Sequence, residues 1–537
     1  MSTTWAALKA KRAGTSGSVA SPSPAAEPET GEEDKRNTDL PSSLEVRHIP
    51  GRGRGVVAVE AFGPGSTLLT TTPLVSVLDQ CNLRHRCSFC FRSVDDTKSS
   101  TAQGGGVAKL QQCSMCHIVQ YCSDVCQKRD WSIHKKECKD LQNSTKTASQ
   151  AHASPPDVVL RALSRLLYLR ESDKAGKLWG AIESLESHRT RLSEKEQEDF
   201  FRLSISFASY VGQKRLKEAC PNAAAVLDLC SRFTSNSFSL TSPADLSNIG
   251  VSISPATALI NHSCHPNAVI VFPSFPSSTS TSPSRYMSVV AIRPIDCGEE
   301  IVTSYVDLAL TKKLRQKELR ERYKFDFSTV TCSACGTSAP YNDVYPALEA
   351  AKLAYEDAER VQREDERTAA IQLQHIIDSL TTSLAPSPPL APSAYPLFSA
   401  RQLLLALHLD AHRFDEAVDT ACAALLGSDI IYHFGHPVRA VLRTTHARLR
   451  TVPPDAPPED GDAQLKWWID LEARQKGRQL LAAAHEEVVT AFGTARIEGS
   501  PVPGGEMGKL LADLIEDQDR GIRFSSIVAA ERLEKDA

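Results

Sequence analysis

The sequence lacks any long apolar run, and no segment approaches the roughly 18 residues that a membrane-spanning helix needs. No apolar signal core follows Met1, so we expect neither a signal peptide nor a membrane anchor. A strong net charge is also absent, because 61 Lys and Arg residues stand against 65 Asp and Glu residues. The formal charge of −4 therefore provides no global basic field that would attract nucleic acid or a membrane surface.

A chain of 537 residues is too long for one core and predicts about three to five structural units. Residues 1–42, rich in Ser, Pro, Ala and Glu, are expected to form a disordered tail. Short β-branched runs predict strands in 43–86 and 236–310, and helical spacing predicts an insertion at 139–235. The segment 341–537 is predicted to be helical and TPR-like, although it shows no clean 34-residue repeat. The expected fold class is therefore α+β, with a divided β-rich domain followed by an all-α domain.

Seven of the fifteen cysteines lie between Cys87 and Cys138. Without a secretory signal, clustered cysteines are more often metal ligands than disulfides. Four regular pairs supply eight soft ligands, which suits two closed tetrahedral zinc sites, whereas cysteines that merely pack in a core would not form such pairs. The pairs are Cys87 and Cys90, Cys113 and Cys116, Cys122 and Cys126, and His134 and Cys138.

Tyr121, Gln127 and Trp131 accompany these ligands, and residues 87–138 as a whole resemble the MYND zinc finger. A RING finger offers a similar number of ligands, but its usual histidine lies among the middle ligands, whereas His134 is the seventh here. The resemblance implies interleaved sites: Cys87, Cys90, Cys122 and Cys126 would hold one ion, and Cys113, Cys116, His134 and Cys138 the other. Closed sites of this kind stabilise a fold and do not catalyse.

A second polar cluster follows the predicted insertion. It consists of NHSC-x-PN beginning at Asn261, GEEI beginning at Gly298, and Tyr305. Each element is weak alone, because such residues are common in turns and hairpin ends. Together they resemble the SET domain, and a SET domain interrupted by a MYND finger is similar to the SET and MYND domain (SMYD-type) protein-lysine methyltransferase family. The resemblance extends from about residue 45 to residue 335.

The family resemblance implies transfer of a methyl group from S-adenosylmethionine (SAM) to a lysine of a histone or non-histone protein. Tyr305 and Tyr323 are the expected catalytic residues, and Tyr323 and Phe325 would wall the lysine channel. An apolar channel and the sulfonium charge would both lower the pKa of the substrate lysine, so no side-chain base is strictly required. The residues implied in cofactor binding are Arg52, Gly53, Arg54, His188, Asn236, Asn261, His262, Tyr305 and Phe325.

A third zinc site is left open in the post-SET segment, residues 311–340. Cys264, Cys332 and Cys335 match three of its ligands, but Phe327 stands where the family has another cysteine. We therefore leave two alternatives open: the three cysteines bind a zinc ion, or their thiols simply pack together.

The competing function is a catalytically weak adaptor whose finger and helical tail bind proline-containing peptides or chaperone tails. The intact Asn261, His262 and Tyr305 favour the enzyme. We further expect a monomer that is found in both cytoplasm and nucleus. Because the SET motifs precede residue 341, deletion of 341–537 is expected to leave the direct cofactor contacts intact and to change the choice of protein substrate.

Overall fold

The computed structural model describes residues 40–93, 109–147, 155–274, 286–325, 345–382, 390–451, 470–497 and 500–536. All of them belong to one compact unit, Thr38–Ala537. The predicted tail, apart from residues 40–42, lies outside the described residues, as do Phe327, Cys332 and Cys335. No helix within the described ranges is long and apolar enough to cross a membrane.

Strands from the two ends of the predicted β-rich domain pair in one four-stranded sheet. Its order is β1 (Leu44–Ile49), β2 (Gly53–Ala58), β12 (Glu300–Thr303) and β9 (Asn261–His262). The outer pair β12 and β9 is parallel, with Val302 beside Asn261 and Thr303 beside His262, whereas the other pairs are antiparallel. The sheet therefore joins three segments that are far apart in the chain: residues 44–58, the NHSC motif at Asn261 and the GEEI motif at Gly298.

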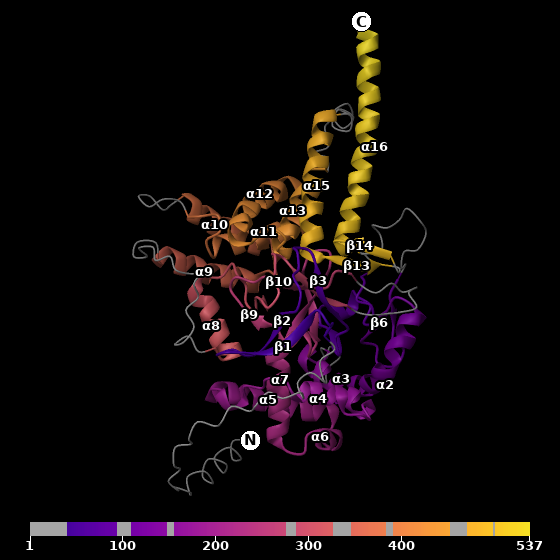
Figure 1. Ribbon diagram of the computed structural model, residues 1–537, viewed down its shortest axis with the longest axis vertical. Coiled ribbons are helices and arrows are strands. Elements are labelled where there is room, and N and C mark those ends of the chain that lie inside the picture. The colour runs from indigo at the N-terminus through magenta and orange to yellow at the C-terminus, as the bar shows by residue number, and fades with distance from the viewer. Residues whose placement is uncertain are drawn as a thin grey trace. The chain divides into compact units, whose positions relative to one another are not determined.

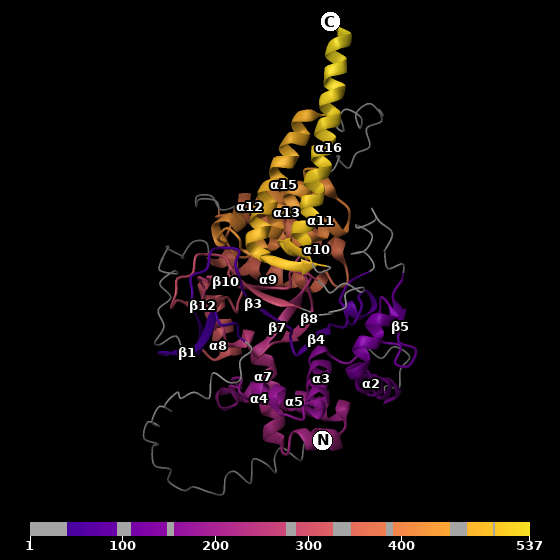
Figure 2. The same cartoon turned by 45° about the vertical axis from the view of Figure 1, so that its right-hand side comes forward.

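Two three-stranded sheets repeat this pairing of early with late strands. One has the order β10 (Ala268–Val271), β11 (Met287–Ala291) and β3 (Thr67–Thr71), and the other β4 (Val75–Leu78), β8 (Asn248–Ile253) and β7 (Ser237–Thr241). Figure 2 shows β7 beside β8. The strands β3 and β4, which precede the finger, thus pair with strands that follow the helical insertion.

The finger contains one hairpin, β5 (Gln111–Gln112) with β6 (Gln120–Tyr121), and the helix α2 (Asp124–Thr147). This helix continues beyond residue 138, where the predicted finger ends. A short 3-10 turn, η2 (Asn82–Arg84), precedes the finger. The described residues contain two further 3-10 turns, η4 (Arg189–Arg191), and η5 (Thr257–Leu259) before β9.

Capped helices build the insertion between the finger and β7. Asp157 accepts a hydrogen bond from the Val159 amide at the start of α3, Ser193 and Glu196 form a capping box on α5, and Asn222 caps α7. Their apolar faces share a buried cluster with Val75, Val77 and Ile253 of the sheet. The helices are α3 (Val158–Ser172), α4 (Lys177–Glu183), α5 (Glu194–Val211), α6 (Gln213–Ala219) and α7 (Ala223–Asn236).

Among the described residues after β12, the elements are helices apart from one short hairpin, β13 (Thr494–Ile497) with β14 (Ser500–Pro503). From α9 to α13 each helix contacts the next along the chain, as Figures 1 and 2 show. The α+β class is confirmed. The helices are α8 (Lys312–Tyr323), α9 (Tyr345–Val361), α10 (Glu366–Thr382), α11 (Leu397–Asp410), α12 (Phe414–Ile431), α13 (Pro437–Leu449), α15 (Leu471–Phe492) and α16 (Gly505–Asp536).

The C-terminal helices share a core with the sheet that contains β10 and β11. Val271, Val290 and Ile292 are buried in one cluster with Val488 and Phe492 of α15. In Figure 1 the lower end of α15 lies against this sheet, and α15 contacts β11. A deletion from residue 341 would remove the helices that cover this sheet and expose its apolar side chains. The shared core therefore argues against the expectation that the deletion leaves the cofactor contacts intact.

We therefore expect a chain that ends at residue 344 to aggregate or unfold. Exposure of Val271, Val290 and Ile292 costs roughly 1.5–3 kcal/mol for each side chain, which is a large part of a typical domain's stability. Thermal unfolding and size-exclusion chromatography would measure the loss. Deletion of residues 1–37, which belong to a separate unit, is the control and should leave both readouts unchanged. A truncated chain that is monomeric and as stable as the full chain would contradict the shared core.

Candidate active site and zinc centres

The finger brings its eight predicted ligands into two groups. Within each group the ligand atoms all lie within 4.8 Å of one another. Seven of the eight side chains are buried and Cys122 is half-buried. The membership is that of the interleaved arrangement: Cys87, Cys90, Cys122 and Cys126 form one group, and Cys113, Cys116, His134 and Cys138 form the other.

The spacing of the ligand atoms suits a tetrahedral zinc ion. Zn–S bonds of about 2.3 Å place neighbouring sulfurs of a tetrahedron about 3.8 Å apart. The Sγ atoms of Cys90 and Cys122 are 3.5 Å apart, and those of Cys113 and Cys138 are 3.9 Å apart. All cysteines in the described part of the chain are free thiols. Four donors in each closed, buried group therefore fit structural zinc and leave no open position for substrate.

Glu300, in the GEEI motif, connects Arg52 to Asn261 at the four-stranded sheet. Its Oε2 accepts a hydrogen bond from Arg52 Nη1 at 2.5 Å, and its Oε1 accepts one from Asn261 Nδ2 at 2.8 Å. Asn261 Nδ2 also donates to the carbonyl oxygen of Arg54 at 3.0 Å. Sequence reasoning did not assign Glu300 a role, although the GEEI motif at Gly298 contains it. In the structure this carboxylate lies between an arginine and an amide and is well placed to orient both.

Gly55 is required by this close approach. A Cβ atom at position 55 would lie 2.8 Å from Glu300 Oε1 and 2.9 Å from Asn261 Nδ2. Gly53 serves differently: its φ of 76° is left-handed, and a Cβ there would meet nothing within 4 Å. The left-handed backbone conformation is therefore one reason for a glycine at position 53. The family resemblance implies a second reason, close approach of the backbone to the cofactor.

His262 is buried next to this polar group and is neutral. Its Nδ1 accepts a hydrogen bond from the Tyr305 amide at 3.0 Å, and its carbonyl oxygen accepts one from Arg52 Nη2 at 2.6 Å. Burial, together with the charges of Arg52 and Arg315, lowers the pKa of His262 to about 4. A neutral ring is also what the Nδ1 acceptor requires, so the backbone of Tyr305 is held by an imidazole that stays uncharged at neutral pH.

Aromatic rings from two segments gather beside His262. The ring centroids of Tyr305 and Tyr323 are 4.8 Å apart, and the Phe325 ring meets those of His262 and Tyr305 edge-on at 5.8 and 6.4 Å. Tyr305 donates its hydroxyl hydrogen to the Ile260 carbonyl oxygen at 2.6 Å. Burial, and secondarily Tyr323, raises the pKa of Tyr305, so its hydroxyl remains protonated.

His188 and Asn236 lie together on the helical insertion. Asn236 Nδ2 donates to the carbonyl oxygens of Glu186 and Arg232 at 2.8 and 2.7 Å. Arg54 Nη2 donates to the Ser184 carbonyl oxygen at 2.5 Å and so ties β2 to the same loop. Lys324, which lies between Tyr323 and Phe325, also pairs with Glu196 of α5, so Arg54 and Lys324 both connect the insertion to the segments around Tyr305.

The backbone and side chain of His188 point to a ligand. Its φ of 51° is left-handed, which is strained for a residue other than glycine. Burial lowers the pKa of His188, and its buried Nδ1 has no hydrogen-bond partner, with Glu186 Oε1 3.5 Å away. A buried polar atom without a partner costs free energy unless a ligand or water satisfies it. The position therefore fits a polar cofactor.

Cys264 follows His262, and its Sγ lies 3.4 Å from His262 Nε2. Its two proposed co-ligands, Cys332 and Cys335, are outside the described residues. The third zinc site therefore stays a prediction.

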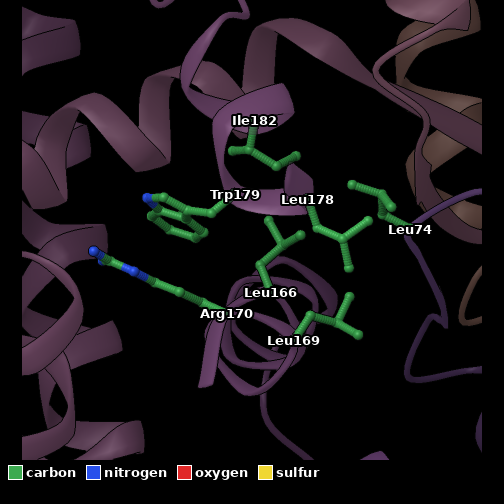
Figure 3. A pocket seen from close by; sticks show the side chains of 7 residues that line it. All are labelled: Leu74, Leu166, Leu169, Arg170, Leu178, Trp179 and Ile182. Atoms are coloured by element: carbon green, nitrogen blue, oxygen red, sulfur yellow. The ribbon is translucent and has the colours of Figure 1, made fainter. Parts of the chain in front are cut away.

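A separate apolar recess lies between α3 and α4 (Figure 3). Leu74, Leu166, Leu169, Leu178 and Ile182 line it, and the Arg170 guanidinium lies 4.4 Å from the centre of the Trp179 ring at its edge. None of the lining residues is an acid, a nucleophile or a histidine, so the recess offers no reacting group.

We expect at least two zinc ions for each undenatured chain. Cys113→Ser and Cys122→Ser should each remove approximately one ion, because the two residues belong to different groups. Metal analysis of the purified protein would count them, and Cys220→Ser, a buried cysteine outside both groups, is the control. A count below two in the unaltered chain would exclude two filled sites.

Comparisons with known proteins agree with these features. The MYND finger family model matches residues 87–138. Human histone-lysine N-methyltransferase SMYD3 is 30% identical over 289 residues, which cover 52% of this chain and 59% of that protein. Xenopus laevis N-lysine methyltransferase SMYD2-B is 29% identical over 300 residues, covering 55% and 61%. Arabidopsis thaliana histone-lysine N-methyltransferase ASHR1 is 28% identical over 303 residues, covering 55% of each.

The matched part thus spans a little more than half the length of these relatives. A solved SET domain structure, that of LSMT bound to lysine and AdoHcy, aligns over 89% of this chain and 88% of that chain at 14% identity. The TM-score of 0.27 is too low to establish a shared fold. The relatives and the family model together confirm the resemblance that the two motifs suggest: the chain contains a MYND zinc finger at 87–138 and is related to the SET and MYND domain methyltransferases.

Proposed function

We propose that this protein is a SAM-dependent protein-lysine N-methyltransferase. The observation that supports it most is the grouping of Tyr305, Tyr323 and Phe325 around the neutral His262, next to the polar group of Arg52, Asn261 and Glu300. An apolar aromatic surface beside fixed hydrogen-bonding groups suits a reaction between a desolvated amine and a polar cofactor. The similarity to named lysine methyltransferases supports the same reaction class.

The residues at the site fit SAM. When bound, SAM would supply an activated methyl group on its sulfonium. Arg52, Gly53 and Arg54 would hold its methionine end, and Asn236, Asn261 and His262 would hydrogen-bond its carboxylate, amine and adenine portions. His188, whose Nδ1 lacks a partner, would contact it from the insertion.

The described side chains of the aromatic group include no base that is ready at neutral pH. His262 has a pKa of about 4, and its Nδ1 is occupied by the Tyr305 amide. Tyr305 is protonated. A substrate lysine with the usual pKa near 10.4 must lose its proton before it can react, at a cost of about 4–5 kcal/mol at pH 7. We propose that the aromatic walls lower this cost by disfavouring the ammonium, and that the proton leaves to water.

The substrate would be a histone or non-histone protein with an accessible lysine, and the protein would act as a monomer in cytoplasm and nucleus. A second candidate is an adaptor that binds proline-containing peptides or chaperone tails. Met115 and Val125, exposed by 53% and 44% on the finger, favour this second function because they offer apolar contact area away from the aromatic group. Transfer of radiolabelled methyl groups to proteins of a cell extract separates the two, since an adaptor would transfer none.

Asn261→Ala should weaken SAM binding by about 1–3 kcal/mol, because it removes a hydrogen-bond donor from a half-buried polar group. Titration calorimetry measures the change. Asn248→Ala is the matched control, since Asn248 is exposed on β8, and should leave the affinity unchanged. Equal affinity of SAM for the Asn261 variant and the unaltered chain would exclude this group from the cofactor site.

Tyr305→Phe should lower turnover by about 10–1000-fold, or roughly 1.4–4 kcal/mol, with little change in SAM affinity. The hydroxyl is expected to act on the reacting methyl, whereas the ring alone keeps most of the packing. Tyr355→Phe removes a comparable hydroxyl contact, to Glu359 on α9, and should leave turnover intact. Single-turnover rates and SAM binding measured side by side test this. Unimpaired turnover of the Tyr305 variant would remove Tyr305 from the chemistry.

A further inference from the structure

A buried set of ion pairs joins the finger to the helical insertion. Glu137 of α2 is 0% exposed, and Arg161 and Arg165 of α3 are 1% and 3% exposed. Glu137 Oε1 accepts from Arg161 Nε at 3.0 Å, and Oε2 accepts from Arg165 Nε at 3.0 Å and from Nη2 at 2.6 Å. Figures 1 and 2 show α2 next to α3, and the two helices contact each other.

Further partners balance the charges of this network. Asp130 accepts from Arg165 Nη1 and Nη2 at 3.1 and 3.2 Å and from the Tyr121 hydroxyl at 2.9 Å. Arg161 Nη1 donates to the Leu78 carbonyl oxygen at the end of β4. Two carboxylates thus face two guanidinium groups, and all four side chains are buried. Such an arrangement is stable only while every member keeps its partners.

The network also reaches a proposed zinc ligand. His134 is fully buried, its Nε2 lies 3.8 Å from Cys116 Sγ, and its Nδ1 lies 3.4 Å from Glu137 Oε2. One ring nitrogen therefore faces the metal group and the other faces the carboxylate. A carboxylate in this place fixes the tautomer and the direction of a ligating imidazole and increases its basicity.

We propose that Glu137 is the positioning residue of the zinc ligand His134. The group of Cys113, Cys116, His134 and Cys138 is called the second metal site below. Through Glu137, this site and helix α3 stabilise each other. The same carboxylate carries both contacts, with Oε2 shared between His134 and Arg165. The finger is then a brace for the insertion that carries His188 and Asn236, in addition to any surface it offers to partners. This role is independent of the methyltransferase reaction.

Zinc release from the full-length protein to a chromogenic chelator tests the proposal. The release of two ions gives two phases, and Cys113→Ser identifies the phase of the second site by removing it. Glu137→Gln should accelerate that phase by about 10–100-fold, the range typical of lost partners of metal ligands, and leave the other phase unchanged. Asp130→Asn is the matched control: it breaks an equally buried pair with Arg165 but leaves the Glu137 carboxylate next to His134 Nδ1 in place, so it should lower the thermal unfolding temperature without accelerating release.

Arg161→Met provides a second variant, which lies on α3 outside the finger and reaches the metal site only through Glu137. Arg161→Met should accelerate zinc release from the second metal site to a smaller extent than Glu137→Gln, because coupling between two sites is reciprocal. If Glu137→Gln does not fold, the result for Arg161→Met tests the proposal alone. The proposal is overturned if neither variant changes the second phase. It is equally overturned if Asp130→Asn accelerates that phase as much as Glu137→Gln, because the effect would then be general destabilisation.

Discussion

The position of β12 between β2 and β9 is the constraint on which the candidate active site depends. Backbone pairing sets Glu300 opposite Val57 and places Val302 and Thr303 beside Asn261 and His262. Once these strands pair, Glu300 holds Arg52 and Asn261 through its two oxygens. Each of these strands has only two to six residues, too few to be stable alone, so the site exists only while the surrounding packing holds the sheet together.

That packing comes from three parts of the chain. The insertion covers β4 and β8 with apolar helix faces, the C-terminal helices bury Val290 and Ile292, and the finger is joined to the insertion through Glu137. Phe91 and Val119 of the finger share a buried cluster with Leu240 and Met287 of the sheets, and zinc bound at the two ligand groups would add metal bonds there. The candidate active site, the finger and the C-terminal helices consequently belong to one folded unit, and loss of one part should destabilise the others.

Much of the candidate site was accessible to sequence reasoning. Ligand pairs such as Cys87 and Cys90 are recognisable because two or three intervening residues bring both side chains to one ion. The motif around Asn261, the segment around Arg52 and the aromatic pair Tyr323 and Phe325 were identified by family resemblance, and the structure groups them around His262. Glu300 escaped assignment, because a GEE sequence at a hairpin end usually faces solvent and only its distant partners reveal its role.

By itself the sequence determined the α+β class, the finger and the motifs, since these depend on composition and on spacings of a few residues. Only the tertiary structure decided that Gly55 must be small, that α15 completes the sheet, and that Glu137 lies between a zinc ligand and two arginines. Glu137 and His134 are three residues apart on α2, but the contacts of Gly55, of α15 and of Glu137 with the arginines join residues that are far apart along the chain. No local period or spacing encodes such approaches, because they arise from the packing of the whole unit.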